Sequence, residues 1–187
     1  PQMVCGIALG TQLSVTAGVG VYAAISRELG LPLRFPGRSD GLLEAVDNMI
    51  IAKAMVWAAI NPQCANQAYN LTNGDSMVWQ NLFPKVAKLF NMESAEDHAV
   101  LLKDAMRDKA PLWEQMVEKY GLTVKDMNYL VGSWDAVDLF FDYGVRDNPA
   151  VLSTIKARKH GFHECEDTED MFIRTLTDMQ DRNLLPR

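Results

Sequence analysis

The sequence predicts an α/β fold that is mostly helical, and two patterns along the chain support this prediction. Up to about Asp75, short β-like runs alternate with stretches of helical periodicity. From Met77 onward, apolar residues recur at three- and four-residue spacing, as they do along helices with one buried face. We therefore expect a few short strands in the first part of the chain and a helical layer in the second.

The first part divides into strands and helices at recognisable breaks. The apolar run Met3–Cys5 leads into Gly6, as a buried strand ending in a turn does. A helix is expected over about Leu13–Leu29, because Gly30 and Pro32 would then end it. Beyond it, the pattern predicts a strand at Leu33–Phe35, a helix near Met49–Ala59, a strand at Ala68–Leu71 and a turn at Asn73–Asp75.

Two apolar stripes indicate helices in the second part. They are formed by Leu82, Val86, Leu89 and Phe90, and by Met171, Ile173, Leu176 and Met179. Pro111 and Gly121 mark breaks between the helices of this region.

Composition favours a globular chain and argues against nucleic-acid-binding and membrane-spanning functions. The chain has 187 residues, of which 48% are hydrophobic and 22% charged, so one domain with a substantial core is expected. A net charge of −6 without a basic stripe argues against nucleic-acid binding. The longest apolar runs, such as 13–25, are too short and too rich in glycine to cross a bilayer, which predicts a soluble chain.

Cysteine and histidine usage predicts a reducing cytoplasm and no metal site. Cys5, Cys64 and Cys165 lie far apart, without a C-x-x-C pair, so a disulfide framework is not indicated. His160 and His163 flank a Gly-Phe pair and lack a cluster of further ligands, which favours a surface turn.

A glycine pattern at Gly18 and Gly20 has two interpretations. Residues 18–23 fit the G-x-G-x-x-A pattern of dinucleotide-binding loops. That pattern needs a preceding strand and a full-length helix after it, whereas only about two helical turns remain before Leu29. We therefore interpret both glycines as small residues that allow close helix packing.

Several segments, read in order, resemble one enzyme family. They are Pro1-x-x-Val4-x-Gly6, Val21–Ile25, Leu33–Gly37, Val56–Ala59, Asn66–Asp75, Trp79, Pro111–Glu114 and His160–Phe162. Together they resemble the C-terminal half of extended short-chain dehydrogenases/reductases, in the progesterone 5β-reductase and iridoid synthase branch. The resemblance covers nearly the whole chain. Because the chain starts within a predicted core strand, we expect it to be the later part of a longer protein.

The resemblance implies that the two parts of the chain have different roles. Residues 1–75 would be a remnant of the dinucleotide-domain edge with its crossover elements, and residues 76–187 a helical substrate-binding and lid region. The family uses NADPH to reduce enones or related activated alkenes and carbonyls by hydride transfer. Its N-terminal Rossmann core holds the phosphate loop and a catalytic tyrosine and lysine, and we expect this core to be absent here. No tyrosine of the chain has a lysine four residues later, so no catalytic residue is assigned and the chain alone is expected to be inert.

The positions that match the family also suggest which residues contact the cofactor and the substrate. The stretch after the family proline passes the nicotinamide, which makes Met3 and Val4 candidates for backbone contacts to the cofactor. A purely structural role for this buried strand is an equally open alternative. The loop Leu9–Ser14 takes the place of the substrate loop, with Leu9, Gln12, Leu13 and Ser14 as candidates. Gln12 and Leu13 stand where relatives carry two methionines, and an amide in an apolar pocket requires a hydrogen-bonding partner.

An aromatic segment supplies the other candidate wall of the substrate cavity. Trp134, Phe140 and Phe141 lie in a region that covers the substrate in the family. Aromatic side chains at helical spacing more often belong to the hydrophobic core than to a binding site. We therefore expect only one or two of these residues to contact the substrate. Asp135 and Asp138 of this segment are expected on a solvated helix face.

Two functions from different classes remain open. One is the substrate-binding half of an NADPH-dependent reductase, partnered by the missing Rossmann portion and acting on a small apolar enone-type substrate, with a homodimer as an open alternative to a monomer. The other is a stand-alone helical protein-interaction domain derived from such a reductase. A severed half should expose the apolar face that once packed on the Rossmann sheet, and this feature discriminates between them.

Overall fold

The structure is a computed structural model that describes residues 3–11, 13–38, 41–143 and 151–187. Its elements include two strands, β1 (Met3–Cys5) and β2 (Ala45–Asp47), which pair in parallel. The helices that bear on the site are α1 (Val15–Glu28), α2 (Asn48–Ile60), α3 (Trp79–Leu89), α6 (Met127–Val131), α7 (Trp134–Asp138) and α9 (Thr168–Asp181). The remaining helices are α4 (Leu102–Ala105), α5 (Ala110–Tyr120) and α8 (Ile155–Lys159), with single turns at Pro62–Cys64 and Leu139–Tyr143.

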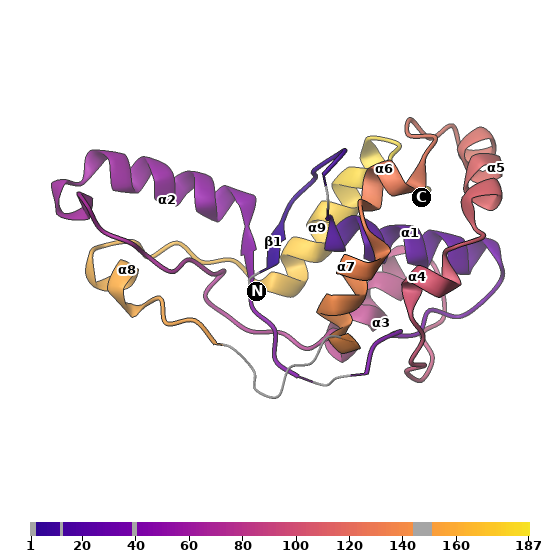
Figure 1. Cartoon of the computed structure of the whole chain (residues 1–187), viewed down its shortest axis with the longest axis horizontal. Coiled ribbons are helices and arrows are strands. Elements are labelled where there is room, and N and C mark those ends of the chain that lie inside the picture. The colour runs from indigo at the N-terminus through magenta and orange to yellow at the C-terminus, as the bar shows by residue number, and fades with distance from the viewer. Residues whose placement is uncertain (1–2, 12, 39–40, 144–150) are drawn as a thin grey trace.

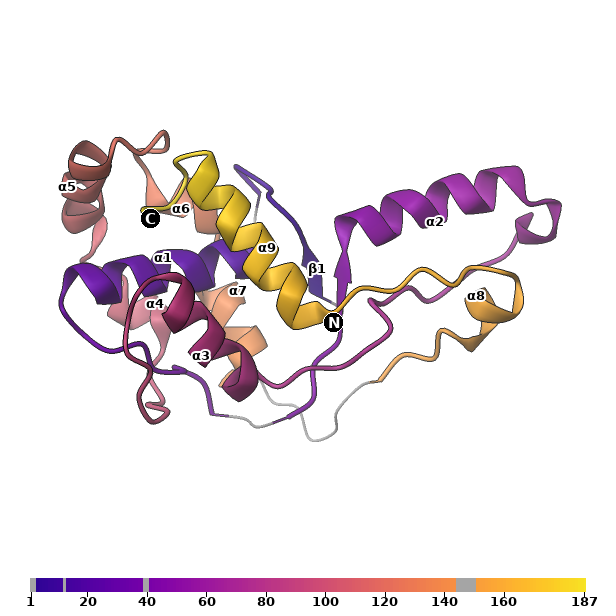
Figure 2. The same ribbon diagram turned by 180° about the vertical axis from the view of Figure 1, so that it is seen from behind.

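The elements form a helical body and an arm (Figure 1). In the body, α1 lies at the centre and contacts α3, α6, α7 and α9. Seen from behind, α9 runs diagonally past α1 and leads toward the start of the arm (Figure 2). The arm consists of α2, the segment that returns from α2 toward the body, and α8 with the described residues on either side of it.

Each part has its own hydrophobic cluster. The body cluster is built around α1 and includes the rings of Trp79, Phe83 and Phe141. The arm cluster is smaller and contains Val46, Ile50, Ala54, Ala157 and Phe162. Both clusters therefore draw on residues from either side of Asp75.

Several predicted elements are confirmed and two are wrong. The strand at 3–5 and the helices near 13–29 and 49–59 are present as β1, α1 and α2. The predicted strand at 33–35 is reduced to an isolated bridge between Leu33 and Ser94, and residues 68–71 form no strand. The strand that pairs with β1 is instead β2, which the sequence pattern did not reveal.

The glycine pair of α1 allows close packing, as predicted. A Cβ on Gly18 would lie 2.9 Å from Val137 Cγ2 of α7. A Cβ on Gly20 would lie 2.5 Å from Leu185 Cδ1 and 2.8 Å from Leu176 Cδ2. Both glycines are buried in the middle of the body, where a bound dinucleotide has no access.

Replacement of Gly20 by valine should destabilise the fold by overpacking. We expect the free energy of unfolding, measured by urea denaturation, to fall by about 1–3 kcal/mol, because Leu176 and Leu185 must move to make room. Ala52→Val is a matched control on an exposed part of α2, where the change should cost less than about 0.7 kcal/mol. Equal losses in the two variants would show that Gly20 is not a packing residue.

Within the described ranges, no helix combines the length and apolarity needed to cross a membrane.

Candidate functional site

The two residues predicted to contact the cofactor lie on β1, with side chains in opposite environments. Met3 is buried in the body cluster, whereas Val4 is 62% exposed. β1 and β2 run in parallel with Met3 opposite Ala45 and Cys5 opposite Asp47, so both strands end at the same edge. In open α/β sheets, ligands bind beyond the carboxyl ends of the strands. The backbone contacts of Met3 and Val4 to a cofactor stay a prediction.

The thiol at this strand end is unsuited to nucleophilic chemistry. The pKa of Cys5 is raised to about 12, chiefly by burial and also by the nearby Asp47 carboxylate, against the opposing effect of a hydrogen bond with Thr16. Cys5 is therefore a neutral, buried thiol at physiological pH, and only the thiolate would be reactive.

The loop predicted to line the substrate pocket is held against α6. The Gly10 amide donates to the Tyr129 carbonyl at 2.9 Å, and the Ser14 amide donates to the Val131 carbonyl at 2.9 Å. Leu9 is exposed, and Leu13 packs partly buried against the body cluster. The Ser14 hydroxyl caps α1 by accepting from the Ala17 amide at 3.3 Å. Gln12 lies outside the described residues.

The three candidate residues of the aromatic segment are all buried in the body cluster. Trp134 begins α7 just after α6, and its indole Nε1 donates to Asn128 Oδ1 of α6 at 3.2 Å. Phe141 is fully buried, with its ring centre 4.8 Å from that of Trp79 and 5.5 Å from that of Phe35. Phe140 is also buried, and its carbonyl accepts from Trp79 Nε1 at 2.9 Å. The structure thus brings the loop and Trp134 to the same helix, α6, and all three aromatic side chains are buried.

The prediction that Asp138 is solvated is wrong. Its side chain is buried and accepts hydrogen bonds from the backbone amides of Leu102 and Lys103, at 2.8 and 3.1 Å. Burial raises the pKa of the Asp138 carboxyl, while the two amide donors lower it. Its role is to hold the first turn of α4 against α7, because helix amino termini have unpaired amides. Asp135, in contrast, is exposed and pairs with Lys103.

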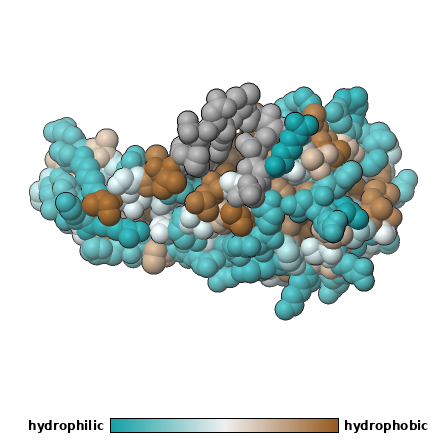
Figure 3. Space-filling view, turned by 90° about the horizontal axis from the view of Figure 1, so that it is seen from below, coloured by the Kyte–Doolittle hydropathy of each residue, from teal (hydrophilic) through white to brown (hydrophobic). Residues whose placement is uncertain are grey.

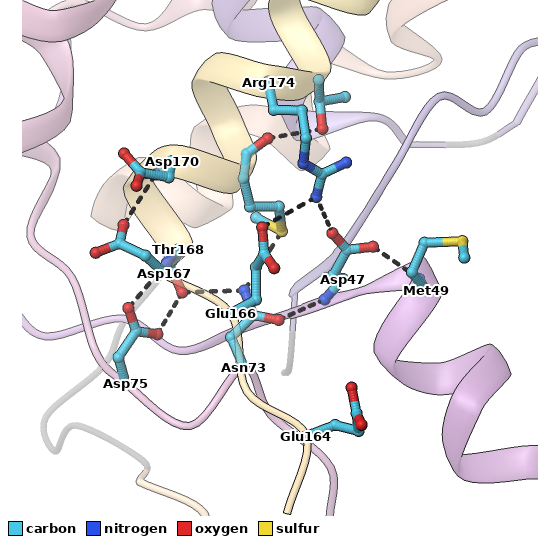
Figure 4. Close-up of polar contacts among 12 residues, drawn as sticks. Asp47, Met49, Asn73, Asp75, Glu164, Glu166, Asp167, Thr168, Asp170 and Arg174 are labelled. Atoms are coloured by element: carbon cyan, nitrogen blue, oxygen red, sulfur yellow. Dashed lines mark hydrogen bonds and ion pairs between the residues drawn. The ribbon is translucent and has the colours of Figure 1, made fainter.

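A buried polar network joins the strand ends to α9 (Figure 4). Asn73 Oδ1 accepts from the Asp47 amide at 2.6 Å, and Asn73 Nδ2 donates to Thr168 Oγ1 at 3.1 Å. Asp75 in turn accepts from the amide and hydroxyl of Thr168. The turn at 73–75 therefore connects β2 to the start of α9.

Asp47 also has several partners in this network. Its carboxylate caps α2 by accepting from the Met49 amide at 2.7 Å, and it forms an ion pair with Arg174 of α9. The Asp47 side chain is almost fully buried, where a carboxylate is stable only if it is paired and hydrogen-bonded. The network fixes the direction in which α2 leaves the sheet.

Sequence reasoning missed most of this network. The Asn-Gly-Asp turn was the available signal, and it indicated a turn without indicating its partners. Arg174 and Asp47 are separated by 127 positions, and no local pattern relates them. His160, expected on a surface turn, lies with its Nδ1 atom 2.7 Å from the Tyr69 hydroxyl within the arm.

The comparisons with known proteins agree on a reductase family. The chain is 31% identical over 193 residues to the (S)-8-oxocitronellyl enol synthase ISY1 of Nepeta cataria and 29% identical to the 3-oxo-Delta(4,5)-steroid 5-beta-reductase of Arabidopsis thaliana. Both matches cover 100% of the chain. The chain is thus similar over its whole length to enzymes of the progesterone 5β-reductase and iridoid synthase type. No protein-family model matches it.

The chain spans about half the length of the curated relatives it matches, 48% for both relatives named above. Among solved structures, the Bordetella bronchiseptica enzyme WbmG in complex with NAD and UDP matches 98% of this chain and 45% of its own, with a TM-score of 0.53 and 11% identity. This likeness supports the predicted fold, a part of an extended Rossmann-type fold.

Proposed function

We infer that this chain supplies the substrate-binding half of an NADPH-dependent oxidoreductase that reduces enones or related activated alkenes and carbonyls by hydride transfer. The observation that carries the proposal is the way in which the loop Leu9–Ser14 is fastened to α6, which the indole of Trp134 also contacts. A loop held by backbone hydrogen bonds keeps its side chains free to line a pocket. The relatives of the chain are enzymes named as enol synthases and a steroid reductase, which supports a small apolar substrate.

The residues of the chain could contact the nicotinamide end of a dinucleotide but not its pyrophosphate. The Gly18 and Gly20 pair is locked in the body by Val137 and Leu185, so it cannot cradle a pyrophosphate. The carboxyl end of β1 could contact the nicotinamide through its backbone, as proposed for Met3 and Val4. Bound NADPH would supply the hydride, and this chain would orient the substrate against it. The phosphate loop and the catalytic tyrosine and lysine must come from a separate nucleotide-binding portion.

Replacement of Gln12 by methionine should shift substrate preference in the assembled enzyme. The test protein is a chimera that joins this chain to the portion of the Nepeta cataria relative that the match leaves uncovered. Removing an amide from an apolar pocket should raise kcat/KM for bulky apolar enones, relative to small polar ones, by about 10- to 200-fold.

Gln115→Met on the exposed side of α5 is the matched control and should leave the ratio unchanged. Equal ratios of kcat/KM for the Gln12→Met chimera and its parent would remove position 12 from the substrate pocket.

A second candidate function is a stand-alone helical protein-interaction domain. The observation that favours it is the exposed apolar surface of α2, which such a domain would use to bind another protein.

A further inference from the structure

The turn at residues 73–75 contains Asn73-Gly74, the only place in the sequence where glycine follows asparagine. An asparagine before glycine is prone to deamidation, because glycine has no side chain to hinder attack by its backbone nitrogen. The turn lies within the polar network of Figure 4, and Asn73 is 0% exposed. The network therefore encloses a dipeptide that is chemically sensitive in an unfolded chain.

The reaction is intramolecular, and water is its only co-reactant. The backbone nitrogen of Gly74 bonds to Cγ of Asn73, the proton of that nitrogen passes to the side-chain nitrogen, and ammonia leaves. The product is a cyclic imide, which water opens at one of its carbonyl–nitrogen bonds. Opening at Cγ gives aspartate, and opening at the backbone carbonyl carbon gives isoaspartate. No group is oxidised or reduced, so the reaction needs no cofactor.

The folded chain holds the side chain of Asn73 through both of its polar atoms. Oδ1 accepts from the Asp47 amide at 2.6 Å. Nδ2 donates to Thr168 Oγ1 at 3.1 Å and to Met171 Sδ at 3.4 Å. Ring closure would require the side chain to rotate out of these contacts, and buried polar groups that lose their partners are costly.

The backbone on either side of the reacting groups is also paired. The Asn73 amide donates to the Ala45 carbonyl at 2.8 Å, and the Asn73 carbonyl accepts from the Glu166 amide at 2.9 Å. The attacking nitrogen, that of Gly74, donates to Thr72 Oγ1 at 3.1 Å. These bonds hold the turn between β2 and the segment before α9. The nitrogen of Gly74 therefore reaches Cγ of Asn73 only if the turn opens.

Conversion of Asn73 would damage the join between the arm and the body. The Thr168 hydroxyl accepts from Asn73 Nδ2 and donates its single proton to Asp75. A carboxylate at position 73 would compete with Asp75 for that proton, and a buried charge without a partner is costly. In the space-filling view from below, the arm extends away from the body (Figure 3). Its attachment depends in part on this network.

We propose that Asn73 is a deamidation site that the network keeps closed in the folded chain, and that its conversion to aspartate or isoaspartate destabilises the join between arm and body. Opening of the turn is then the step that controls the rate of the reaction. This site is independent of the proposed function, because none of its residues is among those proposed to contact cofactor or substrate.

The rate of deamidation at Asn73 is measured by peptide mapping and mass spectrometry during incubation of the 187-residue chain at neutral pH. A sample unfolded in urea gives the rate without protection. The test variant is Thr168→Val, which removes the hydroxyl that Asn73 Nδ2 contacts. The control is Thr177→Val, the same change in α9 at a hydroxyl that donates to the Ile173 carbonyl of its own helix.

In the unfolded sample, Asn73 should react faster than any other asparagine. The folded chain should react at least about 100-fold more slowly, because several buried hydrogen bonds must break in one opening. Thr168→Val should react at least about tenfold faster than the unchanged folded chain, and Thr177→Val should match it. Equal rates in the folded and unfolded samples, or equal rates in the two variants, would overturn the proposal.

Urea below the unfolding transition gives a second measurement that needs no substitution and applies even if Thr168→Val does not fold. The rate in the unchanged chain should rise with urea concentration, because opening exposes surface to the denaturant. A rate that does not change with urea would show that Asn73 reacts without opening of the turn, which contradicts the proposal.

The variant Asn73→Asp tests the consequence, because it carries the aspartate product from the start. Its folding equilibrium constant, measured by urea denaturation, should fall at least about tenfold. Asn70→Asp is the matched control at an exposed residue of the same segment and should fold like the unchanged chain. Equal folding constants for the two variants would overturn the claim that conversion of Asn73 destabilises the join.

Discussion

Phe141→Ala should lower the free energy of unfolding of the chain by about 3–5 kcal/mol, the usual cost of truncating a fully buried phenylalanine. Phe141 contacts the rings of Phe35, Trp79 and Phe83, with ring centres between 4.8 and 6.0 Å apart. These rings join the turn after α7 to α3 and to the segment that follows α1. Truncation would therefore leave a cavity where three separate segments meet.

Leu139→Ala is the matched control, because Leu139 lies in the same turn and is 53% exposed. Its loss should stay below about 1 kcal/mol. Urea denaturation of the two variants measures the difference. Similar losses in both, or a Phe141→Ala chimera that keeps its stability and only raises KM, would place Phe141 in the substrate cavity and contradict its burial.

The parts of the fold that the sequence predicted are those governed by local pattern. The stretch that forms α1 is continuous and ends at Gly30 and Pro32, so its position could be read directly. The strands predicted at 33–35 and 68–71 have β-like composition but lack a sheet partner among the described residues. Strand formation depends on such partners, and a single sequence does not show them.

For the candidate site, as for the fold, the sequence indicated individual segments but not the contacts between distant residues. The resemblance assigned the loop Leu9–Ser14 and the segment that begins at Trp134 to the substrate pocket, and hydrogen bonds join both to α6. It did not decide which aromatic residues are buried, because burial is decided by packing across the body, and all three candidates are buried. The network of Asn73, Asp47 and Arg174 was missed for the same reason, since its members come from three distant segments.

The largest expected effect is the difference in NADPH-dependent turnover between this chain alone and the chimera. Hydride transfer from NADPH requires the cofactor and substrate to be held together and a proton to be supplied, and enzymes gain about a million-fold or more in rate from such an arrangement. This chain contains no Tyr-Lys pair at four-residue spacing, and its Gly18 and Gly20 are packed inside the body. We therefore expect the 187-residue chain to show no turnover, whereas the chimera with the nucleotide-binding portion should be active.

Enone-dependent oxidation of NADPH, followed with the purified 187-residue chain and with the chimera under the same conditions, tests the central claim most directly. The account predicts background rates for the chain with every enone, together with turnover by the chimera that requires both NADPH and an enone. Turnover above background by the 187-residue chain alone would contradict the claim that it is the substrate-binding half of an oxidoreductase.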